Sequence, residues 1–147
     1  MAELHPFFVH FPIAILLVAA AFDLFGVIKK HGQSTATAFY LQLMAGVSAL
    51  LAAISGNLAE MVIQKQEALS LAVTETFGNH VSMGNATVWI IMIVVISRSF
   101  SVFEKKNWAA KGWVFPAISL LLAGLVLVTG LLGGELSQEI LRHFKQN

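Results

Sequence analysis

The sequence predicts an all-α integral membrane protein, a four-helix bundle whose helices run up-down-up-down. Hydrophobic residues make up 57% of its 147 residues and charged residues only 12%, whereas a soluble domain carries about 25% charged residues. The apolar residues gather in four runs, and three of these reach the roughly 20 residues that a spanning helix needs. A formal net charge of +1 gives no electrostatic reason to expect nucleic acid as a partner.

The four runs place the helices in a single domain that covers residues 1–147. We expect the helices at about 7–29, 39–60, 80–98 and 113–133. No Lys or Arg precedes the first run, and it is too long for a signal peptide, so we expect a retained helix. The second and fourth runs hold no charged residue, and the third reaches spanning length when His80 forms its interfacial start. No internal repeat is apparent.

The segment 59–79, between the second and third helices, is also expected to be helical. Apolar residues recur in it at helical spacing, among glutamates, glutamines and a lysine. It could extend the second helix beyond the bilayer, or form an amphipathic helix over the mouth of the bundle. The prediction is therefore a bundle with an outward helical extension.

The basic residues predict the orientation. Six fall on one side of the expected bundle and three on the other: Lys29, Lys30, Arg98, Lys105, Lys106 and Lys111 against Lys65, Arg142 and Lys145. The positive-inside rule places the side with six in the cytoplasm. Both termini and the 59–79 segment are then extracytoplasmic. Asp23, inside the first helix, is expected to pair with Lys30 on the same face.

Four of the five histidines share the outward side. His5 and His10 open the first run, His80 opens the third, and His143 follows the fourth. Ionisable groups are costly near hydrocarbon, so such a cluster indicates a functional site. The chain has no cysteine, which excludes iron–sulfur clusters, zinc–thiolate sites and covalent haem attachment.

Small residues are expected at the depth of these histidines on all four helices. They are Ala14, Gly56, Gly84, Gly130, Gly133 and Gly134. Such a layer either packs tightly or leaves room for a flat ligand. Haem b fits this description, with its iron held by His10 and His80, or by His5 and His143, and its propionates near Arg142.

Three functions from different classes follow. The first is a b-type haem protein that transfers electrons near the extracytoplasmic face, with a redox protein as partner. The second is a structural subunit of a membrane complex, whose small-residue stripe on the second helix supports association with a partner or with itself. The third is a metal-ion site built from His10, His80 and a carboxylate such as Glu60 or Glu135. No arrangement of residues supports hydrolysis or group transfer.

Residues 5–14, HPFFVHFPIA, resemble the opening motif of a family of uncharacterised bacterial multi-pass proteins, the domain-of-unknown-function 2231 family. A Gly in the outer second helix (Gly56), a His at the start of the third helix (His80) and a Gly-Gly end of the fourth helix (Gly133-Gly134) also resemble it. Where many members continue with a Leu-Val-Tyr tail, this chain has Glu135-Leu136-Ser137. The resemblance implies a bundle in the bacterial inner membrane, and it favours a redox role because related domains sometimes adjoin cytochrome-like modules.

Overall fold

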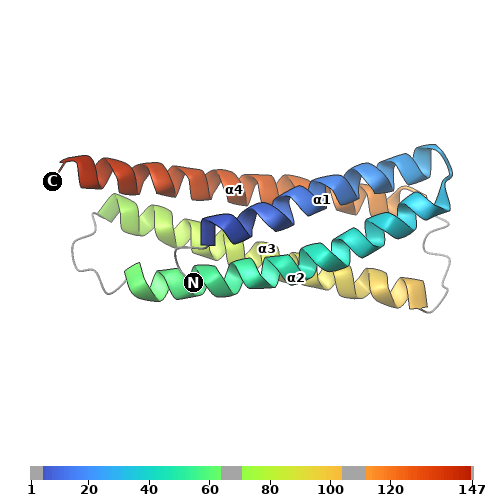
Figure 1. The fold of residues 1–147 in the computed structure, drawn as a ribbon, viewed down its shortest axis with the longest axis horizontal. Helices are drawn as coiled ribbons and strands as arrows, with labels where there is room; N and C mark the ends of the chain where they lie inside the picture. The colour runs from blue at the N-terminus through green and yellow to red at the C-terminus, as the bar shows by residue number, and fades with distance from the viewer. Residues whose placement is uncertain (1–4, 64–70, 104–111, 147) are drawn as a thin grey trace.

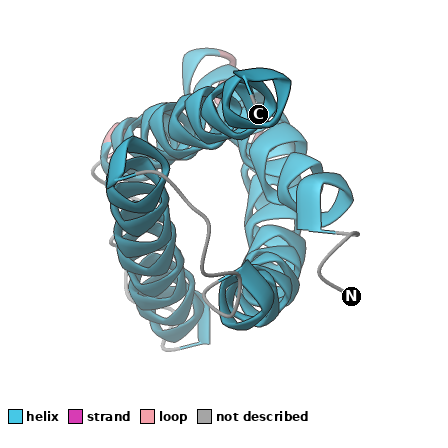
Figure 2. Cartoon of the chain, turned by 90° about the vertical axis from the view of Figure 1, so that its left-hand side faces the viewer, coloured by secondary structure: helices cyan, strands magenta, loops and turns pink. Residues whose placement is uncertain are grey.

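The computed structural model of the protein describes residues 5–63, 71–103 and 112–146. These residues form four helices: α1 (His5–Ile28), α2 (Gly32–Ile63), α3 (Leu71–Phe103) and α4 (Val114–Gln146). They run alternately up and down (Figure 1) and surround a common axis when the bundle is seen end-on (Figure 2). The predicted all-α four-helix fold is confirmed.

Packing between the helices fixes their order around the axis. Helix α1 packs against α2 and α4, and α3 packs against the same two helices. Helices α1 and α3 therefore lie diagonally across the bundle, as do α2 and α4. Two side chains on α1 and α3 can thus face each other from opposite sides of the central axis.

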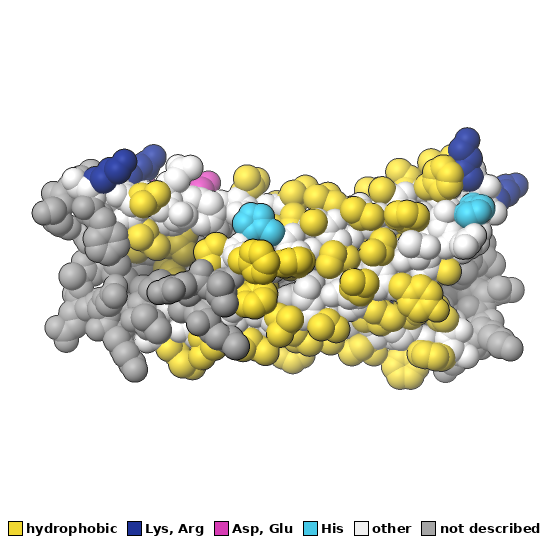
Figure 3. Space-filling model, viewed as in Figure 1, with side chains coloured by type: hydrophobic (Ala, Val, Ile, Leu, Met, Phe, Trp, Pro, Cys, Tyr) yellow, Lys and Arg dark blue, Asp and Glu magenta, His cyan; other side chains and the backbone are white. Residues whose placement is uncertain are grey.

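All four helices are long and apolar enough to cross a membrane. Many large apolar side chains on their outer faces are exposed, among them Leu121 and Leu131 at 74% and 70%. Figure 3 shows hydrophobic side chains over the middle of one face, with Lys and Arg at its two ends. This surface suits a bilayer, because the apolar outer faces would contact lipid.

Three of the helices are longer than the sequence predicts. Helix α2 continues to Ile63 and α3 already begins at Leu71, so most of the 59–79 segment lengthens both helices. Helix α4 continues beyond Gly133 to Gln146. Because α1 begins at His5, the other three helices extend past it at this end of the bundle (Figure 1).

His80 therefore lies inside α3, and the prediction that it opens the third helix is wrong. The turns before it stay helical because they pack on the bundle, where Val73 is only 1% exposed. The run of apolar residues showed where hydrocarbon begins, but a helix can continue beyond the hydrocarbon when one of its faces remains buried.

The turn between α1 and α2 is tight. Lys30 has a φ of 52°, and the backbone N–H of His31 donates to the carbonyl of Gly26 at 2.8 Å. This is the Schellman arrangement that ends many helices. A Cβ at Gly26 would lie 2.5 Å from the Thr35 hydroxyl oxygen, so glycine permits the close approach of α2 to α1 here.

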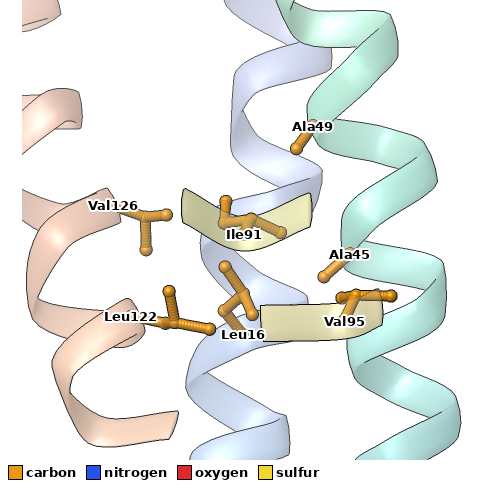
Figure 4. Close-up of a cluster of buried hydrophobic side chains, with 7 residues drawn as sticks. All are labelled: Leu16, Ala45, Ala49, Ile91, Val95, Leu122 and Val126. Carbon is orange, nitrogen blue, oxygen red and sulfur yellow. The ribbon is translucent and has the colours of Figure 1, made fainter. Parts of the chain in front are cut away.

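An apolar layer fills the middle of the bundle and receives side chains from all four helices (Figure 4). It consists of Leu16, Ala45, Ala49, Ile91, Val95, Leu122 and Val126. Polar side chains lie on both sides of this layer. We call the end that carries His5 and His80 the histidine end, and the end that carries Asp23 and Arg98 the arginine end.

The two hairpins, α1–α2 and α3–α4, repeat the same register of buried positions. Four of the six buried residues of α1 have a buried counterpart 75 positions later in α3: Pro12 and Thr87, Leu16 and Ile91, Ala20 and Val95, Asp23 and Arg98. Between α2 and α4 the shift is 77: Gln42 and Ser119, Ala45 and Leu122, Ala49 and Val126. The sequence alone shows no repeat because the side-chain types differ at these positions.

Candidate functional site

Two histidines from diagonal helices face each other at the histidine end. The ring centroids of His5 and His80 lie 6.2 Å apart, and their planes meet at 70°. Both side chains are half-buried. They are also counterparts, because the 75-residue shift between α1 and α3 relates one to the other. Each hairpin thus contributes one imidazole to the centre of the bundle.

Helical geometry explains why His5, and not His10, reaches the centre. With 3.6 residues per turn, His5 shares a face with the buried residues Pro12 and Leu16, whereas His10 is about 140° away. His10 is exposed, and its Nδ1 donates to the carbonyl of Pro6 one turn earlier. The structure therefore joins His5 to His80, a combination that the sequence analysis did not pair.

The imidazole of His5 is held at its Nδ1. This atom lies 3.1 Å from the carbonyl oxygen of Ala52 and 3.0 Å from the hydroxyl oxygen of Ser55. The Ser55 hydroxyl itself donates to the Ala52 carbonyl at 2.8 Å, so both neighbouring oxygens act as acceptors. Nδ1 must then carry the proton, which leaves the lone pair of His5 on Nε2. Metal-ligating histidines usually have this kind of support on the other ring nitrogen.

The imidazole of His80 is less firmly held. Its Nδ1 is buried and has no hydrogen-bond partner among the residues that the structure describes. The backbone of Thr129, the counterpart of Ala52, lies close enough to His80 for a weak hydrogen bond, but the contact falls short of normal hydrogen-bond geometry. A buried polar atom without a partner is uncommon and calls for an explanation, such as a ligand or a water.

Each histidine lies directly against a glycine of the neighbouring helix. A Cβ at Gly56 would be 2.9 Å from Cε1 of His5, and a Cβ at Gly133 would be 2.9 Å from Cε1 of His80. These two glycines are themselves counterparts, 77 positions apart. No other residue type would fit in either place without moving the imidazole.

A cavity of about 590 Å³ surrounds the two imidazoles. Of the predicted site residues, His5, His10, His80, Gly56, Gly84, Gly130 and Gly134 line it. Apolar and small side chains make up most of the wall, and Ile91 and Val126 of the apolar layer form part of it. Its size lies within the roughly 300–1,000 Å³ of small-molecule and cofactor sites.

Two predicted site residues, Ala14 and Arg142, lie elsewhere. Ala14 is exposed, because nine helical positions place it about 180° from His5. Arg142 is exposed and forms an ion pair with Glu139 at 3.1 Å. His143 belongs to α4, but its side chain lies outside the described residues.

A second polar cluster occupies the arginine end. The guanidinium of Arg98 donates twice to Asp23, at 2.6 Å each. It also donates to the side-chain oxygen of Gln42 at 2.9 Å and to the carbonyl of Thr35 at 3.2 Å. Ser119 donates to Asp23 and accepts from Gln42. Asp23 is 0% exposed and Arg98 is 2% exposed.

This cluster corrects one expectation, because Asp23 pairs with Arg98 across the bundle and not with Lys30. Arg98, expected at the end of the third helix, lies inside α3. Sequence reasoning missed the pair because its members are 75 residues apart. Their five hydrogen bonds and the stacking of Arg98 on Phe115, 4.6 Å from the ring centroid, indicate a structural connection and not a mobile proton carrier.

Comparison with known proteins gives one family. The model of a family described as predicted membrane protein (DUF2231) matches residues 2–145. Comparison with curated proteins and with solved structures finds no match.

Proposed function

Because the chain belongs to this DUF2231 family of predicted membrane proteins, whose description names no activity, we propose a function from the site itself. The protein binds one haem b between His5 and His80 and transfers electrons at the histidine end. The observation that carries the proposal is the pair of facing imidazoles in an apolar cavity.

The spacing of the two rings suits ligation of one iron from both sides. Metal–imidazole bonds are about 2.0 Å long, so two rings that bind one metal from opposite sides have centroids roughly 6 Å apart. The centroids of His5 and His80 are 6.2 Å apart. The protonated Nδ1 of His5, which donates to the Ala52 carbonyl, leaves the lone pair of Nε2 available to a ligand.

The set of available donors favours haem over a bare metal ion. Among the described residues, no group of three His, Cys, Asp or Glu side chains could hold a metal together. Protein-bound zinc has three or four protein ligands, whereas two imidazoles are sufficient when a macrocycle supplies four nitrogens. The alternative metal site with Glu60 or Glu135 therefore has less support than haem.

The surrounding residues would fit and tune the cofactor. Glycines and alanines leave space around the imidazoles, and the wall of the cavity is mostly apolar. Haem would supply one-electron chemistry. The chain would hold it through the His5 and His80 imidazoles, and the hydrogen bond from His5 and the low-polarity surroundings would influence its redox potential.

The orientation belongs to the same proposal. Arg98 is buried in an ion pair, so five basic residues, and not six, remain at the arginine end against three at the histidine end. This bias still favours a cytoplasmic arginine end. The histidine end would then face the outer side of a bacterial inner membrane, where a redox protein could approach it.

Absorption spectra test this function. The protein is purified in mild detergent from haem-supplied cells, and spectra are recorded before and after dithionite. We expect a Soret band that shifts on reduction, with sharp α and β bands. It should be lost in His5→Ala, changed in His80→Ala, and retained in the controls His10→Ala and His31→Ala.

Other outcomes would support the alternatives. Bound metal without a Soret band, removed by His80→Ala, would support the metal-ion site. A protein that stays folded and carries neither haem nor metal would contradict the proposal and leave the structural-subunit alternative.

A further inference from the structure

We propose that the two histidines are chemically unequal: His5 is the permanent axial ligand, and His80 is a replaceable ligand whose place a small neutral molecule can take. This inference rests on the proposed haem site. A small neutral ligand such as carbon monoxide would then bind on the His80 side of the cavity.

The inequality follows from the comparison of the two hairpins. At three positions around the site the halves agree: His5 and His80, Gly56 and Gly133, and the carbonyls of Ala52 and Thr129. They differ at the position before the glycine, where α2 has Ser55 and α4 has Leu132. Among the described residues, only the first hairpin therefore has a hydroxyl within hydrogen-bond distance of Nδ1 of its histidine.

That hydroxyl gives His5 a fixed orientation. Nδ1 of His5 has two oxygen atoms within 3.1 Å, and Ser55 is 1% exposed. Rotation of the imidazole would break contacts that water could not replace at a buried position. A ligand whose second nitrogen is held in this way keeps both its tautomer and its direction.

His80 has no equivalent restraint. Its buried Nδ1 has no partner of normal hydrogen-bond geometry among the described residues, so rotation of the ring breaks only a weak contact with the Thr129 backbone, whereas His5 would lose two hydrogen-bond contacts. One turn further along α3, a Cβ at Gly84 would meet nothing within 4 Å, and Gly84 lines the cavity. The imidazole thus has both the freedom and the space to move aside.

Binding of carbon monoxide to the dithionite-reduced protein measures this difference. We expect the wild-type haem to bind carbon monoxide, with an affinity limited by competition from His80. His80→Ala should keep its haem and bind carbon monoxide at least about tenfold more tightly, which corresponds to about 1.4 kcal/mol. His5→Ala should lose haem during purification.

A matched pair of substitutions tests the cause. Leu132→Ser places in α4 the hydroxyl that Ser55 provides in α2, so it should hold His80 and weaken carbon monoxide binding. Ser55→Ala should loosen His5 and lower haem affinity about 10- to 100-fold, the usual effect of losing such a support. Leu131→Ser is the control, at the neighbouring residue, which is 70% exposed. It should change neither carbon monoxide binding nor haem affinity.

The outcomes separate this inference from the haem proposal. A wild-type protein without a Soret band contradicts the proposed function before carbon monoxide is added. A protein that holds haem but responds equally to His5→Ala and His80→Ala has two equivalent ligands, which overturns the inequality. Loss of haem in His80→Ala with retention in His5→Ala would overturn it as well, with the roles reversed.

Discussion

At the scale of single residues, Asp23 and Arg98 carry opposite charges into the interior of the bundle. Their bidentate contact, with Gln42, Ser119 and the Thr35 carbonyl around it, satisfies both ions. Since charges are costly within a membrane protein, such a pair is held only where the surrounding helices are fixed. The pair joins α1 to α3, and therefore joins one hairpin to the other.

Removal of one partner should destabilise the protein strongly. Asp23→Ala leaves Arg98 buried without its counter-ion, which typically costs about 3–5 kcal/mol. Asp23→Leu combined with Arg98→Met should recover most of this loss, because no charge then remains buried. The midpoint of thermal unfolding in detergent measures both effects. A double variant no more stable than Asp23→Ala would show that the ions stabilise by more than mutual neutralisation.

At the scale of the elements, glycine positions decide how closely a helix approaches the imidazole of its neighbour. Gly56 of α2 lies against His5, and Gly133 of α4 lies against His80. A Cβ at Gly134 or Gly84, in contrast, meets nothing within 4 Å. Packing thus distinguishes glycines that the sequence shows as equivalent.

Gly133 and Gly134 are neighbours in the sequence and allow the two kinds of glycine to be compared directly. Gly133→Ala should displace His80, because a new Cβ 2.9 Å from its Cε1 cannot be accommodated without movement. Gly134→Ala should leave His80 in place, because its added Cβ meets no atom within 4 Å. It should also stabilise α4 slightly, since Ala exceeds Gly in helix propensity by up to about 1 kcal/mol. Haem content and the position of the Soret band are the measurements. Equal effects of the two substitutions would contradict the packing of His80 on Gly133.

At the scale of the whole molecule, the bundle consists of two similar hairpins around a shared axis. The axis passes between His5 and His80, through the apolar layer, and between Asp23 and Arg98. At the histidine end His5 is paired with His80 and Gly56 with Gly133, and at the arginine end Asp23 is paired with Arg98, which carries the opposite charge. Opposite charges allow the two halves to join as a pair, whereas two identical charges at those positions would repel.

The cysteine-free sequence permits a direct test of the proposed orientation. Single cysteines are introduced at His31, beside the arginine end, and at Lys145, near the end of α4. We expect an impermeant maleimide to label Lys145→Cys in intact cells, and His31→Cys only after the membrane is opened. Labelling of His31→Cys in intact cells would reverse the orientation and place the histidine end in the cytoplasm.

Sequence reasoning located the candidate site in part. It named His5, His80 and most of the small residues around the cavity, because a topology of four crossings brings the starts of the first and third helices to the same side. It paired His10 with His80, or His5 with His143, and did not pair His5 with His80. It did not find Ser55, whose role depends on a contact between α1 and α2.

By itself, the sequence determined the class of the protein, its four helices and the end at which the histidines gather, because these follow from the local balance of apolar and charged residues. Tertiary structure decided which histidines meet, which glycines lie against an imidazole and which residue pairs with Arg98. These depend on the rotation of each helix about its own axis. That rotation is set by packing among all four helices, so residues 75 positions apart become neighbours.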